Sequence, residues 1–190
     1  MNTTRTTRHA FRLRPLTVWL AGLAMLLLAL DARAGADSGN DNRAPDLDDC
    51  PKLQVPAGNK VAFHVYAEGV QIYRWDGTAW TFVAPEADLF ADEDGDGEVG
   101  SHYAGPTWES DSGSLVVGAV LERCTPDPDS IPWLLLEAVY TEGPGIFERV
   151  TYIQRVNTVG GKAPTDPGNA VGDEARVPYS AEYFFYRKSN

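Results

Sequence analysis

The sequence predicts an all-β protein, and three observations support this prediction. From about residue 60 onward, the apolar residues come in short groups that are rich in β-branched and aromatic side chains. Glycine, proline, aspartate and asparagine separate these groups. No window of a dozen residues holds an unbroken helical pattern. We therefore expect short antiparallel strands in a single-domain β-sandwich or closed β-barrel, with helix as a minor element.

Seven segments fit strands in succession along the chain. Asp76-Gly77 lies between two of them and is a strong signal for a hairpin turn. The segment 133–140 comes nearest to a helical pattern, and Pro132 could start a short helix there. The expected strands are 60–68, 70–75, 79–83, 114–123, 133–141, 147–156 and 181–187.

The N-terminal segment has the features of a secretory signal peptide. Four arginines precede an apolar run over residues 16–30, and Ala32-Arg33-Ala34 follows as a small-residue cleavage site. The run is shorter than the roughly 20 residues that span a bilayer. We expect residues 1–34 to be removed, residues 35–52 to form a flexible acidic leader and residues 53–190 to form the β domain. The protein would then be exported to the periplasm or the extracellular space.

The chain is acidic, with a formal net charge of −11. Removal of residues 1–34 takes away five arginines and one aspartate, which leaves 11 basic and 26 acidic residues and a net charge of −15. Such a surface disfavours nucleic acid and, after signal cleavage, anionic membranes as partners. A small molecule, a glycan or another protein is the expected class of partner.

Cys50 and Cys124 are the two cysteines of the chain. In an oxidising compartment an even pair predicts one disulfide, which would tie the leader to the body of the domain. The alternative is a pair of separate buried thiols. No further ligand-type residues sit close to either cysteine in the sequence, so a zinc site is not supported.

An acidic loop resembles part of a calcium-binding loop. Its aspartates alternate at positions 1, 3 and 5, and Gly97 fills position 6. Position 12 is Tyr103 rather than glutamate, so the loop is not an EF-hand, and Glu109 or Asp111 would have to complete a Ca²⁺ shell. The alternative is a solvated turn. The calcium ligands would be Asp92, Asp94, Asp96 and, through its carbonyl, Glu98.

The residues after this loop fit two kinds of site. A histidine exchanges protons near neutral pH, so His102 with Glu109 or Asp111 would serve a secreted hydrolase. Glu109 and Asp111 could also form the carboxylate pair of a glycoside hydrolase. Alternatively, Trp108 and Tyr103 offer aromatic faces for a sugar ring or an apolar ligand.

Arg155 and Asn157 stand in or beside an otherwise apolar strand, and we count both as candidate ligand-binding residues. An unpaired buried guanidinium is costly, so Arg155 must reach solvent or find a carboxylate. Glu109 and Glu137 are its candidate partners. The pattern favours a structural ion pair over an anion site.

Six segments together resemble a known family. They are residues 69–73, 85–89, 102–109, 131–135, 152–161 and 177–183. In order and spacing they are similar to the exported bacterial and fungal family called domain of unknown function 3455, over about residues 55–187. The resemblance implies a shared fold and export, but no established activity.

The sequence therefore favours a binding module for a small molecule, a glycan or a surface partner. A hydrolase that uses His102 is the alternative hypothesis, and a structural envelope protein is a third hypothesis. Convergence of His102 with Glu109 or Asp111 in a pocket would favour the enzyme. A His102 side chain held by the backbone, beside an exposed flat face of Trp108, would favour binding.

Overall fold

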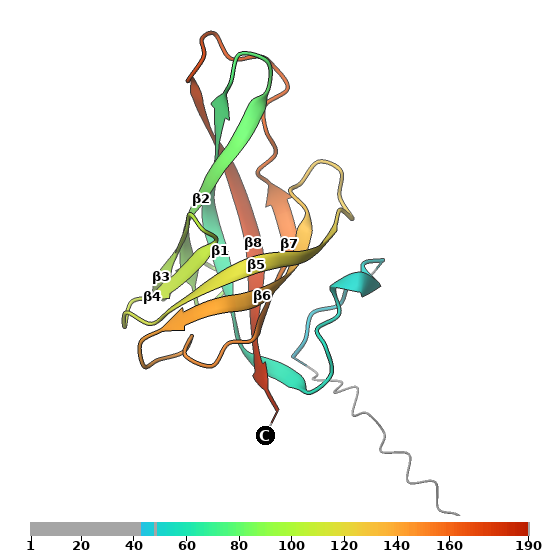
Figure 1. The fold of residues 1–190 in the computed structure, drawn as a ribbon, viewed down its shortest axis with the longest axis vertical. Coiled ribbons are helices and arrows are strands. Elements are labelled where there is room, and N and C mark those ends of the chain that lie inside the picture. The colour runs from blue at the N-terminus through green and yellow to red at the C-terminus, as the bar shows by residue number, and fades with distance from the viewer. Residues whose placement is uncertain (1–42, 48, 190) are drawn as a thin grey trace, which may run out of the picture. The chain divides into compact units, whose positions relative to one another are not determined.

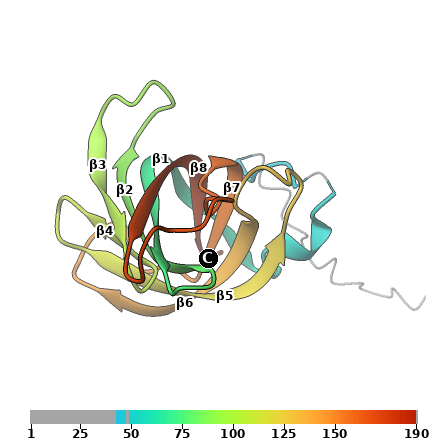
Figure 2. The same cartoon turned by 90° about the horizontal axis from the view of Figure 1, so that it is seen from above.

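A computed structural model describes residues 43–47 and 49–189, and the expected signal peptide and residues 35–42 lie outside this part of the chain. Eight antiparallel strands each pair with the next strand in sequence, and the last pairs with the first (Figure 1). The sheet therefore closes into a ring, which Figure 2 shows from above. The all-β prediction is confirmed. The strands are β1 (Asn59–Trp75), β2 (Trp80–Phe90), β3 (Glu98–Tyr103), β4 (Thr107–Ser110), β5 (Leu115–Cys124), β6 (Trp133–Glu142), β7 (Tyr152–Gly160) and β8 (Glu174–Lys188).

The ring is not a regular barrel, because its strands differ greatly in length. β1 has 17 residues and β8 has 15, whereas β4 has four. The two segments expected at 60–68 and 70–75 form one continuous strand, β1, with Gly69 between them. Gly69 pairs with Ala87 of β2, and a Cβ at Gly69 would lie 2.2 Å from the carbonyl oxygen of Glu86. The close approach of the two backbones at this point therefore requires glycine.

The helix considered at residues 133–140 is wrong, since this segment is strand β6 and pairs with β5 and β7. Its first four residues are all buried. Leu134 and Leu136 belong to the core inside the ring, while Trp133 and Leu135 belong to a second cluster. Burial on both faces removes the usual alternation of apolar and polar residues, which is why the pattern was ambiguous. The only helical element among the described residues is the short 3₁₀ turn η1 (Pro51–Leu53).

The second cluster forms where the segment before β1 covers the outer face of the sheet. Cys50, Leu53 and Val55 pack there against residues of β6, β7 and β8. Gln154 of β7 donates a hydrogen bond from Nε2 to the carbonyl of Leu53, at 2.7 Å. Ala44 and Leu47 also pack against this cluster, so the packed region begins before Cys50.

The predicted disulfide is confirmed. Cys50 and Cys124 are bonded, with their Cα atoms 5.8 Å apart. The bond joins the segment before η1 to the last residue of β5. It therefore holds the covering segment against the ring.

The two ends of the ring differ. At one end, the β6–β7 loop places Phe147 against Phe63 and Phe185, with ring centroids 5.5 and 5.0 Å apart. Phe147 is 1% exposed, and it closes this end of the core. The β2–β3 and β4–β5 connections lie at the same end, because neighbouring strands run in opposite directions. The β1–β2, β3–β4, β5–β6 and β7–β8 connections surround the other, open end.

Candidate functional site

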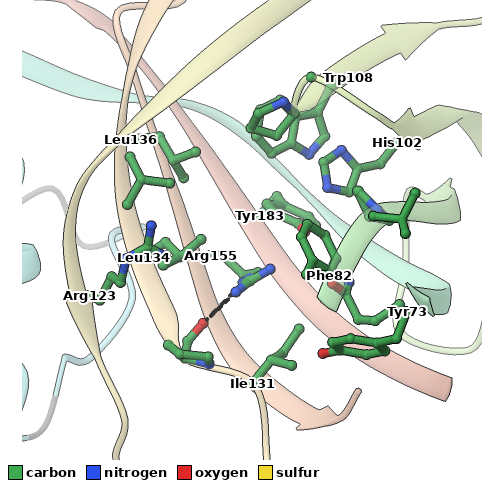
Figure 3. A pocket seen from close by; sticks show the side chains of 17 residues that line it. Tyr73, Phe82, His102, Trp108, Arg123, Ile131, Leu134, Leu136, Arg155 and Tyr183 are labelled. Atoms are coloured by element: carbon green, nitrogen blue, oxygen red, sulfur yellow. Dashed lines mark hydrogen bonds between the residues drawn. The ribbon is translucent and has the colours of Figure 1, made fainter. Parts of the chain in front are cut away.

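A cavity of about 350 Å³ lies inside the ring at its open end (Figure 3). This volume falls at the lower end of the range of about 300–1,000 Å³ for small-molecule sites. Aromatic side chains and the aliphatic side chains Val120, Ile131, Leu134 and Leu136 make up most of its wall. The polar side chains of the wall, apart from His102 and the tyrosines, are Gln71, Arg123 and Arg155. The aromatic side chains are Tyr73, Phe82, His102, Trp108 and Tyr183.

His102 and Trp108 form a stacked pair on this wall. They are directly opposite each other in the pairing of β3 with β4, and both are buried. Their ring centroids are 4.4 Å apart and the rings are tilted by 9°. Tyr183 of β8 meets both rings edge-on, at 5.1 and 5.2 Å. The three rings thus form a continuous aromatic surface from three strands.

The His102 side chain is held neutral by its surroundings. Burial lowers its pKa to about 3, and the hydrogen bond to Thr107 opposes this shift only in part. Nδ1 lies 2.8 Å from the carbonyl oxygen of Thr107, so in the neutral ring Nδ1 carries the proton and donates it. The Nδ1 proton is therefore committed to the backbone, and Nε2 is left as an acceptor.

The carboxylates expected to act with His102 lie elsewhere. Glu109 is on the opposite face of the sheet from Trp108, and its Oε2 accepts a 2.7 Å hydrogen bond from the hydroxyl of Tyr103. This bond raises the pKa of Tyr103. Asp111 follows β4 at the closed end, where its amide bonds the carbonyl of Val99. The structure therefore does not bring the three predicted catalytic residues together.

Arg155 enters the cavity from β7, and its expected ion pair is not formed. Its Nε and Nη2 donate to the carbonyl oxygen of Pro132, at 3.1 and 2.8 Å. Neither Glu109 nor Glu137 pairs with it, and no aspartate or glutamate lines the cavity. The second arginine of the cavity wall, Arg123, is exposed. The cavity thus has two cationic side chains and no anionic one.

Three buried side chains of the cavity wall have a polar atom without a well-formed hydrogen bond to the protein, although Gln71 and Tyr183 lie beside the hydroxyl of Tyr179. These atoms are Gln71 Nε2, Trp108 Nε1 and the hydroxyl of Tyr183. The residues are 3%, 1% and 1% exposed, respectively. The hydroxyl of Tyr179, also on β8, is a fourth such atom. Buried polar groups nearly always have a partner, so this grouping indicates a polar ligand atom or water in the cavity.

The predicted ligand-binding residues divide into two groups. Trp108 and Arg155 line the cavity, but Trp108 is buried rather than presenting the exposed flat face considered in the sequence analysis. Tyr103 is bonded to Glu109 away from the cavity, and Asn157 lies at a bulge of β7 with a φ of 51°. Asn157 donates to Glu182 on the exposed surface, at 2.8 Å. The sequence reasoning missed Gln71, Tyr73 and Tyr183, whose inward direction depends on how the ring closes.

The acidic loop lies at the closed end of the ring, away from the cavity mouth. The side chains of Asp92, Asp94, Asp96 and Glu98 are exposed, and Asp92 Oδ1 accepts the amide of Asp96 at 2.9 Å. In residues 43–47 and 49–189, no three His, Cys, Asp or Glu side chains are grouped to share an ion. Calcium binding stays a prediction from the sequence pattern.

A closed all-β ring with a ligand-sized interior cavity is the class of protein that these observations define. The chain belongs to the family described as protein of unknown function (DUF3455), which matches residues 56–187. The family resemblance seen in the sequence is thus confirmed. No curated protein and no solved structure shows a significant match to the chain. Along the described residues, no helix is long and apolar enough to cross a membrane.

Proposed function

We propose that the protein is a binding module that takes a small apolar molecule into the open end of its ring. The observation that carries this proposal is the cavity of about 350 Å³, which combines apolar walls with buried polar atoms that the protein leaves unpaired. Small β-barrels can hold a single small ligand in this way. The polar atoms would orient the ligand, and the apolar walls would supply most of its affinity.

The arrangement of the walls suits a flat apolar body. Trp108, His102, Tyr183 and Phe82 lie on one side of the cavity in Figure 3, and Leu134 and Leu136 lie on the other. A ligand between them would lose apolar surface to water on both faces. Each buried square ångström contributes about 25 cal/mol.

Two alternatives have less support. A hydrolase that uses His102 lacks a carboxylate beside that residue, because Glu109 bonds Tyr103 on the other face of the sheet. A glycan offers many hydroxyl groups, yet the cavity wall is mostly apolar and has no carboxylate to accept their hydrogen bonds. A small apolar ligand fits the wall better than either.

The site of action that we propose is outside the cytoplasm. The arginine-rich start, the apolar run and the small-residue cleavage site support export. The Cys50–Cys124 disulfide is consistent with an oxidising compartment. The acidic composition argues against nucleic acid as a partner.

The test is a fluorescence titration with the neutral apolar dye N-phenyl-1-naphthylamine, whose emission rises when it leaves water. Val120→Trp would fill part of the cavity from β5, and Val139→Trp is its control, because Val139 is 59% exposed. We expect saturable binding to the wild type, at least tenfold weaker binding to the Val120 variant and unchanged binding to the Val139 variant. Failure of the folded wild type to bind the dye, or equal effects of the two substitutions, would refute the proposal.

A further inference from the structure

We infer that Arg155 makes the cavity selective for a small apolar molecule that carries one carboxylate. The inference rests on the proposed binding function and specifies the class of ligand. Three features of the cavity support it: a guanidinium without an anionic partner, the direction in which that group is held, and the chemistry of the unpaired atoms beside it.

The charge of the cavity contrasts with that of the rest of the chain. The chain has a net charge of −11, yet no carboxylate lines the cavity that holds Arg155. Placing a guanidinium partly inside an apolar cavity costs free energy, and the carbonyl of Pro132 offsets only part of that cost. A bound anion would supply the missing charge.

Three acidic side chains in the loops around the open end are already engaged in hydrogen bonds of their own. Asp76 caps its own turn by accepting the amides of Thr78 and Ala79. Asp127 and Asp173 are likewise engaged within their own loops. Their negative charge near the entrance also disfavours ligands with several negative charges, which leaves a monoanion as the fitting partner.

The guanidinium of Arg155 is oriented by its contact with Pro132. Nε and Nη2 both point to one carbonyl oxygen, which uses one side of the group. Of the five N–H donors of an arginine, three remain, and two of them lie along the edge between the terminal nitrogens. This edge matches the two oxygens of a carboxylate. Figure 3 shows the guanidinium between the aromatic and aliphatic side chains, as this role requires.

The unpaired atoms in the cavity wall are hydrogen-bond donors. Gln71 Nε2 and Trp108 Nε1 can only donate, and burial raises the pKa of Tyr183, so its hydroxyl keeps a proton to donate. Tyr183 also lies beside Arg155 and Tyr179, and the charge of Arg155 and hydrogen bonding from both side chains to the Tyr183 oxygen oppose the rise of its pKa. Its own hydroxyl proton stays free to donate. Donors without acceptors call for a ligand that is rich in acceptor oxygens. A carboxylate has about four lone-pair positions.

The experiment compares two ligands that differ mainly in charge: 2-naphthoate and its neutral amide, 2-naphthamide. Each is titrated against bound N-phenyl-1-naphthylamine at neutral pH. The proteins are the wild type, Arg155→Gln, Arg155→Lys and, as a matched removal of one charge at the cavity wall, Arg123→Gln. Dye binding to each variant shows whether its cavity is intact.

We expect the wild type to bind naphthoate at least tenfold more tightly than naphthamide, a difference of about 1.4 kcal/mol. Arg155→Gln should abolish this preference, Arg155→Lys should keep part of it, and Arg123→Gln should keep most of it. If Arg155→Gln does not fold, the inference is still tested by the preference of the wild type for naphthoate and by the size of that preference in Arg155→Lys.

The outcomes separate the two proposals. Dye binding without a preference for naphthoate would overturn the carboxylate inference and leave the binding function standing. A preference that is lost in Arg123→Gln but kept in both Arg155 variants would also overturn it. Absence of dye binding to the wild type would instead refute the binding function itself.

Discussion

Acid should destabilise this protein through protonation of His102. The substitution His102→Phe should remove the part of the acid sensitivity that this histidine causes. In the wild type, the imidazole of His102 is buried against Trp108 and Tyr183, and burial lowers its pKa to about 3 from an ordinary value of 6.5. Between these two values the unfolded chain binds a proton at this histidine and the folded chain does not. Lowering the pH therefore favours the unfolded state. Phenylalanine keeps a stacked ring but cannot take up the proton.

The size of the effect follows from the width of that pH window. Each pH unit well inside it costs the folded state about 1.4 kcal/mol. Because pH 6.5 lies at the edge of the window, the step from pH 6.5 to pH 4.5 costs about 2 kcal/mol. Carboxylates that contribute to acid sensitivity, such as Asp76 and Glu86, have a lowered pKa in both proteins, and their effect cancels in the difference. Loss of the bond to Thr107 lowers the stability of the variant by a constant amount, about 1 kcal/mol.

The assay is urea unfolding followed by tryptophan fluorescence, with the free energy of unfolding measured at pH 7.5, 6.5, 5.5 and 4.5. We expect the wild type to be the more stable protein at pH 7.5. Between pH 7.5 and pH 4.5, the difference in free energy of unfolding should shift by about 3 kcal/mol in favour of the variant. A difference between the two proteins that stays constant from pH 6.5 to pH 4.5 would refute the argument. It would mean that folding does not exclude the charged form of His102.

Two further predictions concern the ring itself. The double substitution Cys50→Ser/Cys124→Ser should lower the free energy of unfolding by about 4 kcal/mol, because the disulfide closes a loop with a sequence separation of 74. A loss below about 1 kcal/mol in urea unfolding would argue against this account. Gly69→Ala should cost about 2 kcal/mol or more, since the new Cβ would lie 2.2 Å from the Glu86 carbonyl oxygen. A melting temperature equal to that of the wild type would contradict the close approach of β1 and β2.

Local sequence signals predicted the parts of the fold that local chemistry controls. Asp76-Gly77 forms the expected hairpin turn, in which the amide of Asp76 bonds the carbonyl of Ala79 at 3.0 Å. Most of the β-branched and aromatic groups became strands, as expected. The strand expected at 147–156 is wrong over residues 147–151, which belong to the β6–β7 loop, and β7 begins at Tyr152. Residues 98–103 and 107–110 were not foreseen as strands, because they are short, rich in polar residues and glycine, and next to the acidic loop.

The candidate site was harder to predict, because nearness along a strand differs from nearness in space. The candidate residues between Asp92 and Asp111 were grouped on the basis of their sequence positions. A strand rises about 3.4 Å per residue, so β3 carries the chain over about 20 Å from the closed end toward the open end. Side chains also alternate between the faces, which separates Trp108 from Glu109 although they are neighbours in sequence.

The sequence by itself determined the all-β class, the disulfide and the family, because composition, spacing and short motifs carry those properties. Only the tertiary structure decided that the sheet closes into a ring and that one end stays open. Ring closure brings Arg155, Trp108 and Gln71, each from a different strand, to one cavity. It also determines which buried atoms are left without a partner, since that depends on the neighbours that each strand finds across the ring.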